Sequence, residues 1–330
     1  MNTIARFAAL LSVLAGHGAA WAAWEPDKPV ELIVPSGAET RIDQTARLIQ
    51  GIVVKHKLMK QDLVIANKSG GMGAEAFFLL KNGLVEPHRI MIAGNGLFSV
   101  PLTTGVPFNW KNFSPVVTLS LEPFILWTHS KDGYESARAY LDAAKSAGPY
   151  KMKMRGAGTK QEDQFLTIAI ERATGVKFTY LPSKPFPDEG SQQAFDSALF
   201  NPMERETLSR NGTLTPQCVF NDTRLSVGRK SNGTLAWDEI PTCKEAGIDV
   251  SYQAPTSIFM GPGVTDEQKK YFITLFKQVV ETPEWGGYME QGAYSRVFMT
   301  GQELRSWLAA TEEMHKRAVT PICEYKYPCY

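Results

Sequence analysis

The sequence predicts an α/β protein of two lobes, and three observations lead to this prediction. Short apolar strands alternate with segments of helical periodicity, as in a parallel sheet covered by helices. Two strongly apolar segments, Phe124–Trp127 and Ser257–Met260, are placed where the chain could cross between lobes. The chain has 330 residues, which is long enough for two domains of ordinary size.

The first part of the chain alternates three strands with two helices. Val30–Pro35 has the composition of a strand that ends in a polar loop, and apolar residues then recur at helical spacing through 42–57. A second strand at 63–66, a helix at 74–81 and a third strand at 90–94 follow. This order predicts parallel strands with helices between them.

After Trp127 the chain is expected to build a second lobe. Its elements are a helix at 136–147, a strand at 151–154, a helix at 161–174, and strands at 178–181 and 214–220. Helices at 266–281, 284–291 and 301–318 then close the chain. Two crossings divide the protein into a discontinuous first domain, 23–125 plus 257–330, and a second domain, 126–256. Hinged two-lobe binding proteins have this layout.

The N-terminus has the pattern of a signal peptide. Arg6 precedes the apolar stretch Phe7–Ala15, and Ala20 and Ala22 are the small residues expected before cleavage. We therefore assign 1–22 as a leader, because the apolar stretch is too short for a membrane span, and expect a periplasmic protein. The net charge is +1 and the basic residues are scattered, so the mature chain is not expected to bind nucleic acid.

Four cysteines are present: Cys218, Cys243, Cys323 and Cys329. Four cysteines allow three pairings, and export makes disulfides plausible. The simplest arrangement joins the cysteines that are nearest in sequence, Cys218 with Cys243 and Cys323 with Cys329. No histidine lies close in sequence to either pair, which disfavours a metal site.

Sequence motifs of the common enzyme classes are missing. The segment 156–161 does not fit the phosphate-binding loop, and the glycines at 70–73 do not extend to the dinucleotide pattern. Neither a Gly-x-Ser-x-Gly elbow nor a His-Glu-x-x-His motif occurs. A triad of distant residues stays open. We expect a protein that is not an enzyme and that carries no cofactor or metal.

Two loops share one setting, between the end of a strand and the start of a helix. They are Ser36, Gly37, Ala38, Glu39 and Thr40 in the first lobe, and Gly156, Ala157, Gly158, Thr159 and Lys160 in the second. Helix N-termini present free N–H groups that bind carboxylates, and ligands of open α/β sheets bind at the carboxyl ends of strands. Either loop alone is more simply an ordinary turn, but two in separate lobes predict a clamp for an anion.

Six longer strings run through nearly the whole mature chain: Thr45–Ile52, Asn67–Glu75, Gly105–Trp110, Gly158–Gln164, Ile240–Gly247 and Thr282–Trp285. Through them the chain resembles the substrate-binding proteins of tripartite tricarboxylate transporters, also called Bug-type binding proteins. The resemblance implies a periplasmic-binding-protein-like fold of type II, with two lobes that are each a helix-covered mixed sheet.

The resemblance also implies a ligand and partners. The ligand is a small organic acid, held in the cleft largely by backbone amides of the two loops, and the partners are the membrane permease subunits of the transporter. Asn95 and Gly96 fall on a third contact region, and Asp196, Ser197 and Asn201 fall on a segment of the second lobe that faces the cleft. We expect the protein itself to be a monomer.

The first loop departs from the family pattern. The family has a run of glycines before an aspartate, whereas this chain has Ala38–Asp43. A carboxylate at Glu39 that faced the cleft would repel an anionic ligand. Arg41, Lys160 or Arg155 would then have to compensate, or the ligand differs, or the pocket has lost its function.

Three functions remain open at this stage. The first is a receptor that delivers an acid to a transporter, the second a receptor whose closed form signals to a membrane sensor kinase, and the third a secreted enzyme on the same fold. Neighbouring genes for permease subunits or for a kinase would separate the first two. Turnover assays with esters or acids would reveal the third.

Overall fold

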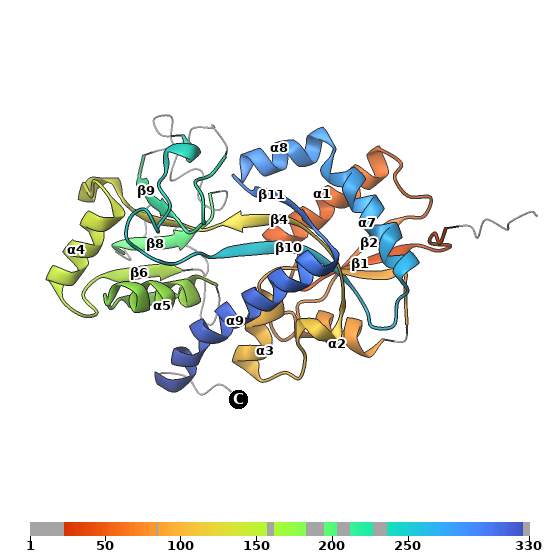
Figure 1. The fold of residues 1–330 in the computed structure, drawn as a ribbon, viewed down its shortest axis with the longest axis horizontal. Coiled ribbons are helices and arrows are strands. Elements are labelled where there is room, and N and C mark those ends of the chain that lie inside the picture. The colour runs from red at the N-terminus through yellow and green to blue at the C-terminus, as the bar shows by residue number, and fades with distance from the viewer. Residues whose placement is uncertain are drawn as a thin grey trace, which may run out of the picture.

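The protein consists of two lobes, each built on one sheet (Figure 1). The computed structural model describes residues 23–83, 85–156, 162–182, 195–202, 212–226 and 236–325, with side chains as far as Arg317. The first sheet has the strand order β11-β4-β10-β3-β1-β2 and the second β7-β6-β8-β5-β9. Both sheets combine parallel and antiparallel pairs, so the predicted fold of two mixed-sheet α/β lobes is confirmed.

The first lobe contains the elements from both ends of the chain. Its strands are β1 (Val30–Val34), β2 (Leu63–Asn67), β3 (Arg89–Ala93), β4 (Ser114–Pro123), β10 (Gln253–Met260) and β11 (Ser295–Met299). Its helices are α1 (Arg41–Lys55), α2 (Ala74–Asn82), α3 (Gly96–Thr104), α7 (Asp266–Val280), α8 (Pro283–Gln291) and α9 (Gly301–Tyr325).

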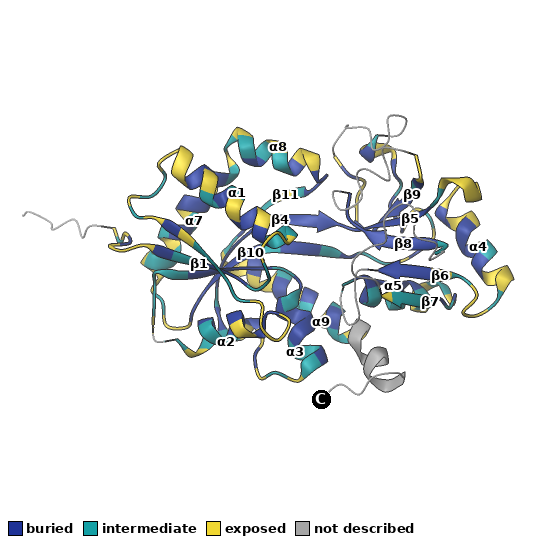
Figure 2. Ribbon diagram, turned by 180° about the vertical axis from the view of Figure 1, so that it is seen from behind, coloured by how far each residue is buried: buried dark blue, intermediate teal, exposed yellow. Residues whose placement is uncertain are grey.

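The second lobe is formed by the middle of the chain. Its strands are β5 (Ile125–His129), β6 (Lys153–Gly156), β7 (Thr179–Pro182), β8 (Ser197–Phe200) and β9 (Leu214–Val219), and its helices include α4 (Ala137–Ala147) and α5 (Glu162–Thr174). The strands of both lobes are largely buried, while the helices alternate buried and exposed residues (Figure 2). The helices therefore cover the sheets with their apolar faces.

Local sequence explains where several helices begin and which face they bury. Ala46, Ile49 and Val53, the apolar residues of α1, are buried in one cluster with strand residues of β1 and β2. Helix α8 begins at Pro283, whose missing N–H is tolerated at the first helical position. The side chain of Thr282 caps this helix by accepting from the N–H of Trp285.

The sheet topology brings strand ends together. Strand β1 lies between β2 and β3 and is parallel to both, so Val34, Asn67 and Ala93 end at the same edge of the first sheet. In the second lobe β6 and β8 are parallel, and Gly156 and Phe200 end at a common edge. These are the edges at which open α/β sheets bind ligands.

Two strands carry the chain between the lobes (Figure 1). Strand β4 leads through Phe124 into β5, and β10 returns with Gln253 paired to Pro123. The ring of Tyr252, just before β10, packs edge-on against Phe124 with 5.4 Å between ring centroids. The return crossing thus lies at Tyr252, a few residues before the boundary expected at Ser257.

Helix α9 forms a third link between the lobes, which the sequence did not reveal. It packs against α3 of the first lobe and α5 of the second, and Figure 1 shows it running beneath β10 from one lobe toward the other. Arg172 of α5 donates a hydrogen bond to the carbonyl of Arg317 in this helix. None of the described helices has the length and apolar character needed to span a membrane.

The predicted pairing of Cys218 with Cys243 is confirmed. Cys218 lies in β9 and both residues are fully buried in the core of the second lobe. The disulfide therefore ties the segment after β9 to this sheet. Side-chain positions for Cys323 and Cys329, and the predicted leader 1–22, lie outside what the structure describes.

Candidate functional site

A cavity of about 550 Å³ lies between the two lobes. One wall follows the carboxyl ends of β1 and β3, where Ser36 and Asn95 line it. The opposite wall is the first turn of α5, with Glu162 and Asp163, and Phe124 at the first crossing also lines it. Because it touches both lobes at strand ends and helix starts, this cavity is the candidate ligand site.

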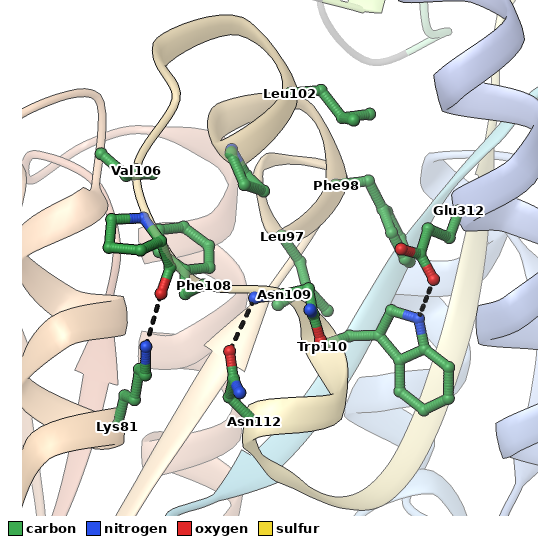
Figure 3. A pocket seen from close by; sticks show the side chains of 12 residues that line it. Lys81, Leu97, Phe98, Leu102, Val106, Phe108, Asn109, Trp110, Asn112 and Glu312 are labelled. Carbon is green, nitrogen blue, oxygen red and sulfur yellow. Dashed lines mark hydrogen bonds between the residues drawn. The ribbon is translucent and has the colours of Figure 1, made fainter. Parts of the chain in front are cut away.

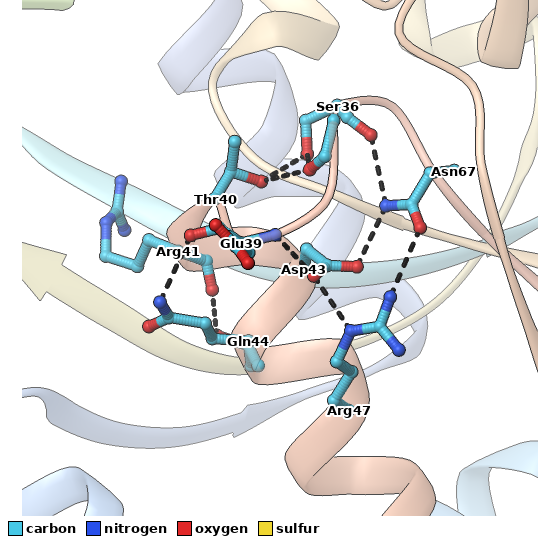
Figure 4. Close-up of polar contacts among 10 residues, drawn as sticks. Ser36, Glu39, Thr40, Arg41, Asp43, Gln44, Arg47 and Asn67 are labelled. Carbon is cyan, nitrogen blue, oxygen red and sulfur yellow. Dashed lines mark hydrogen bonds and ion pairs between the residues drawn. The ribbon is translucent and has the colours of Figure 1, made fainter.

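The loop between β1 and α1 is closed by its own hydroxyl groups (Figure 4). Ser36 Oγ and Thr40 Oγ1 are 2.6 Å apart, and Thr40 Oγ1 donates to the carbonyl of Gly37 at 2.9 Å. Thr40 is the N-cap residue of α1, yet its side chain does not cap the helix. The first-turn N–H groups have no intrahelical acceptor, so the helix start at the cavity suits an anion.

Asp43 anchors this loop from within α1 (Figure 4). Its buried carboxylate accepts hydrogen bonds from the N–H of Glu39 at 2.9 Å, from Arg47 Nε at 2.9 Å and from Asn67 Nδ2 at 2.8 Å. Burial would raise the pKa of Asp43, but the hydrogen bonds from Arg47 and Asn67 outweigh it and the pKa is lowered. Asp43 thus shapes the loop as an ionised anchor.

A second polar group joins the lobes at the edge of the cavity. Arg41, the first residue of α1, lines the cavity and forms an ion pair with Glu122 of β4. Glu122 is 4% exposed and also accepts a hydrogen bond from Asn201, which follows β8 in the second lobe. The predicted site residue Asn201 therefore does not line the cavity but donates a hydrogen bond to Glu122, the partner of Arg41.

The third predicted contact region, Asn95 and Gly96, lines the cavity at the start of α3. Asn95 is 1% exposed, and its Nδ2 donates to Tyr252 Oη at 3.2 Å. Tyr252 Oη is in turn 3.2 Å from Nε2 of His315 in α9. Burial lowers the pKa of His315 to about 4, so this histidine is neutral at physiological pH.

The second-lobe loop is described only at its edges. Gly156 ends β6, and a Cβ there would lie 2.3 Å from Tyr180 Oη and 2.5 Å from the Cβ of Asp163, so only glycine fits. Ala157, Gly158, Thr159 and Lys160 lie outside the described residues. The following Glu162 and Asp163, in the first turn of α5, line the cavity.

Six of the predicted residues that the structure describes do not line the cavity: Ala38, Glu39, Gly156, Asp196, Ser197 and Asn201. Ala38 and Glu39 are exposed, because the loop turns outward there and Glu39 adopts a left-handed backbone with φ 65°. Asp196 and Ser197 lie at the amino end of β8, opposite the edge that faces the first lobe. Asp196 accepts from the N–H of Lys153 at 2.6 Å and Ser197 is 2.5 Å from Tyr140 Oη, so both belong to the packing of the lobe.

Several cavity residues were missed by sequence reasoning. Ser69 follows β2, so the rule that pointed to the ends of the other parallel strands also applies to it. Glu162 and Asp163 belong to the first turn of α5, next to the loop that was proposed. The segment Ala254–Thr256 lines the cavity from the middle of a strand pairing and carries no local signal.

A separate cavity of about 400 Å³ lies between α2, α3 and α9 (Figure 3). Its polar side chains are engaged with the protein itself. Lys81 Nζ donates to the carbonyl of Pro107, and Trp110 Nε1 donates to Glu312 at 2.8 Å. This cavity is confined to the first lobe and its side of α9, and is a weaker candidate. Within the described ranges, no cluster of three or more His, Cys, Asp or Glu residues could hold a metal ion.

Comparison with known proteins identifies the fold. No family model and no curated protein matches the sequence. A TctC solute-binding protein from Polaromonas superposes with a TM-score of 0.73 and 21% identity, over 90% of this chain and 99% of that one. Rpa4515 of R. palustris with adipate gives 0.72 and 18%, over 89% and 98%. MatC from Rhodopseudomonas palustris with bound malate gives 0.67 and 17%, over 89% and 99%. The chain thus has the two-lobe fold of these proteins.

Proposed function

We propose that the protein is a solute-binding receptor of the TctC or Bug type, which captures a small organic acid between its lobes. In this proposal the receptor works in the periplasm and delivers the acid to the permease subunits of a tripartite tricarboxylate-type transporter. The cavity between the lobes, at the start of α1 and of α5, is the observation that carries it. An anion there meets two helix N-termini at once.

The comparisons and the chemistry of the chain support the location and the ligand class. Two proteins of the same fold were solved with adipate and with malate, which are both small dicarboxylates. The leader pattern at 1–22 and the buried Cys218–Cys243 disulfide fit an exported protein. Hinged closure would act at Phe124 and Tyr252, where the chain crosses.

In the proposed clamp, the two lobes have different roles. The Ser36–Thr40 loop and the N–H groups that open α1 receive one carboxylate, while the segment 156–160 before α5 receives the other end of the ligand. Arg41 offers less charge to the ligand than the sequence suggests, because Glu122 is paired with it. Binding would therefore depend mainly on backbone amides and hydroxyl groups.

Native mass spectrometry of freshly purified protein would test the proposal first, because a buried acid often co-purifies. Calorimetric titration with the acid found, or with C4–C6 dicarboxylates, then gives the affinity. Small-angle scattering at saturation should show a smaller radius of gyration. If no acid binds and the radius is unchanged, the proposal is wrong.

A matched pair of variants ties binding to this cavity. Gly37 lines the cavity and has open space around a Cβ, so Gly37→Phe should fill the cavity and reduce affinity at least about tenfold. Gly51 is exposed on α1 and equally open, so Gly51→Phe introduces the same bulk elsewhere. Equal affinities for the two variants would place the ligand outside this cavity.

A further inference from the structure

A chain of hydrogen bonds runs from α9 through the return crossing to the cavity. His315 is fully buried, with Nδ1 2.8 Å from the carbonyl oxygen of Thr311 and Nε2 3.2 Å from Tyr252 Oη. Tyr252 Oη is 3.2 Å from Asn95 Nδ2, and Asn95 lines the cavity. The ring of Phe98 stacks on His315 at 5.0 Å between centroids, which holds the imidazole in place.

The chemistry of these groups fixes which atom donates and which accepts in each of these hydrogen bonds. A carbonyl oxygen only accepts, so the proton of the neutral imidazole sits on Nδ1 and Nε2 is an acceptor. The Tyr252 hydroxyl must then donate to Nε2, and its oxygen accepts from the amide of Asn95. The amide therefore turns Nδ2 toward Tyr252 and leaves Oδ1 on its other side.

Asn95 Oδ1 is a buried acceptor with no hydrogen-bond partner among the described residues. An unpaired acceptor of this kind destabilises a protein unless a donor reaches it. Tyr252, which accepts the hydrogen bond from the amide nitrogen of Asn95, does not line the cavity, whereas Asn95 does. The unpartnered acceptor therefore belongs to a residue of the cavity wall.

We propose that Asn95 is a specificity-determining residue, and that its Oδ1 accepts a hydrogen bond from a hydroxyl or ammonium group on the ligand. The inference rests on the proposed function and narrows the ligand to an organic acid that also carries a donor, such as a 2-hydroxy or 2-amino acid. Tyr252 and His315 are positioning residues that fix which amide atom Asn95 presents.

The charges around the cavity agree with a donor on the ligand. Arg41 lines it but is paired with Glu122, and the acidic residues Glu162 and Asp163 form part of the opposite wall. A plain dicarboxylate brings only acceptors to these groups. A hydroxyl or ammonium group supplies a donor, and sites built to bond such a group discriminate strongly against analogues that lack it.

The test compares ligands that differ only in the donor. Calorimetry is run with succinate, malate and aspartate, and with the corresponding unsubstituted, 2-hydroxy and 2-amino acids of five and six carbons. We expect a substituted acid to bind at least about tenfold more tightly than its parent acid. The readout is this ratio of affinities rather than either affinity alone.

Variants test whether this ratio of affinities depends on Asn95 and Tyr252. Asn95→Ala removes the acceptor, and Tyr252→Phe frees the amide to turn, so both should bring the ratio close to one. Asn82→Ala, at an exposed position of α2, and Tyr271→Phe, in α7, are the matched controls and should keep it. Thermal melting verifies that each variant is folded.

The possible results are distinct. A ratio above tenfold that collapses in Asn95→Ala and Tyr252→Phe supports the inference. Acids that bind without a preference for the donor, or a preference that survives Asn95→Ala, overturn it and leave the proposed function standing. If none of these acids binds and none co-purifies, the proposed function itself fails.

Discussion

Arg41 in α1 and Glu122 in β4 form an ion pair at the edge of the cavity, and Glu122 also accepts a hydrogen bond from Asn201 of the other lobe. Arg41 is the one described basic side chain on the cavity wall, yet its charge is already matched by a carboxylate that is 4% exposed. The positive charge that the cavity wall presents is thus limited by this pair.

Releasing Arg41 should strengthen the binding of acids. Glu122→Gln keeps an oxygen for Asn201 but removes the charge, so the affinity for a dicarboxylate should rise about tenfold. Stability should fall by about 1–2 kcal/mol, because Arg41 loses its buried partner. Titration calorimetry and urea unfolding measure the two effects. Glu31→Gln, which breaks an ion pair with Arg89 away from the cavity, should leave affinity unchanged; weaker binding in Glu122→Gln would contradict the prediction.

Glu39 should influence the backbone more than the ligand. It is exposed and has φ 65°, a conformation that costs a non-glycine residue about 1–2 kcal/mol. Glu39→Gly should therefore raise stability by about 0.5–1 kcal/mol after the entropy of glycine is counted. Affinity for an acid should change less than about threefold, since an exposed charge is screened.

Glu39→Ala serves as the control for this effect, because alanine removes the charge but keeps the strained backbone. It should show no gain in stability in chemical denaturation. A large gain in affinity for both variants would mean that Glu39 faces the ligand when the lobes close.

His315 should make the protein sensitive to acid. Burial lowers its pKa to about 4 from 6.5, so the unfolded chain binds a proton in this range that the folded protein excludes. Stability attributable to His315 is present above pH 6.5 and falls by about 3 kcal/mol as the pH drops to 4. Urea unfolding from pH 7 to 4 measures it.

Comparing variants separates the loss of stability due to His315 from the loss due to carboxyl groups that titrate in the same pH range. His315→Gln should lose less stability on acidification than the natural protein. The control His56→Gln, at a partly exposed site beside Glu284, should lose as much stability as the natural protein. Parallel pH profiles for the natural protein and His315→Gln would show that the histidine does not titrate as expected.

The Cys218–Cys243 disulfide should contribute about 3 kcal/mol to stability. It closes a loop with a sequence separation of 25 residues, and closure of such a loop restricts the unfolded chain. Denaturation of Cys218→Ala/Cys243→Ala tests the value without touching Cys323 and Cys329. A difference below about 1 kcal/mol would show that the unfolded chain gains little freedom when the bond is removed.

Elements with a complete local pattern were predictable. The strands at β1, β2 and β3 and the helices α1, α4 and α7 lie within a few residues of the expected positions. The elements α3, β4, β8 and β11 were missed. Pro101 lies inside α3 and disfavours a helix there, whereas β4 has a clear strand composition of valine, threonine and leucine that sequence reasoning did not use. Strand β6 lies at Lys153–Gly156 instead of 151–154, because pairing with β7 and β8, rather than composition, decides where it ends.

The candidate site was only partly predictable. Ligands of open α/β sheets bind at the carboxyl ends of strands, and this rule correctly pointed to the loop after β1 and the start of α3. Ser36, Thr40 and Asn95 in these segments line the cavity. The rule could not show that Glu39 turns outward, since this depends on the bond from its N–H to Asp43. Nor could it show that Asp196 and Ser197 lie at the far end of β8, because strand direction comes from the sheet.

The sequence by itself predicted the α/β class and, as the simplest of three possible pairings, the Cys218–Cys243 disulfide, because periodicity and spacing along the chain carry these features. Only the tertiary structure decided the chemistry of the cavity. The partners of Arg41 and Asn95 come from β4, the return crossing and α9, which lie far away in sequence. Hydrogen bonds and ion pairs depend on distances of about 3 Å between such groups, and those distances exist only once the lobes have packed.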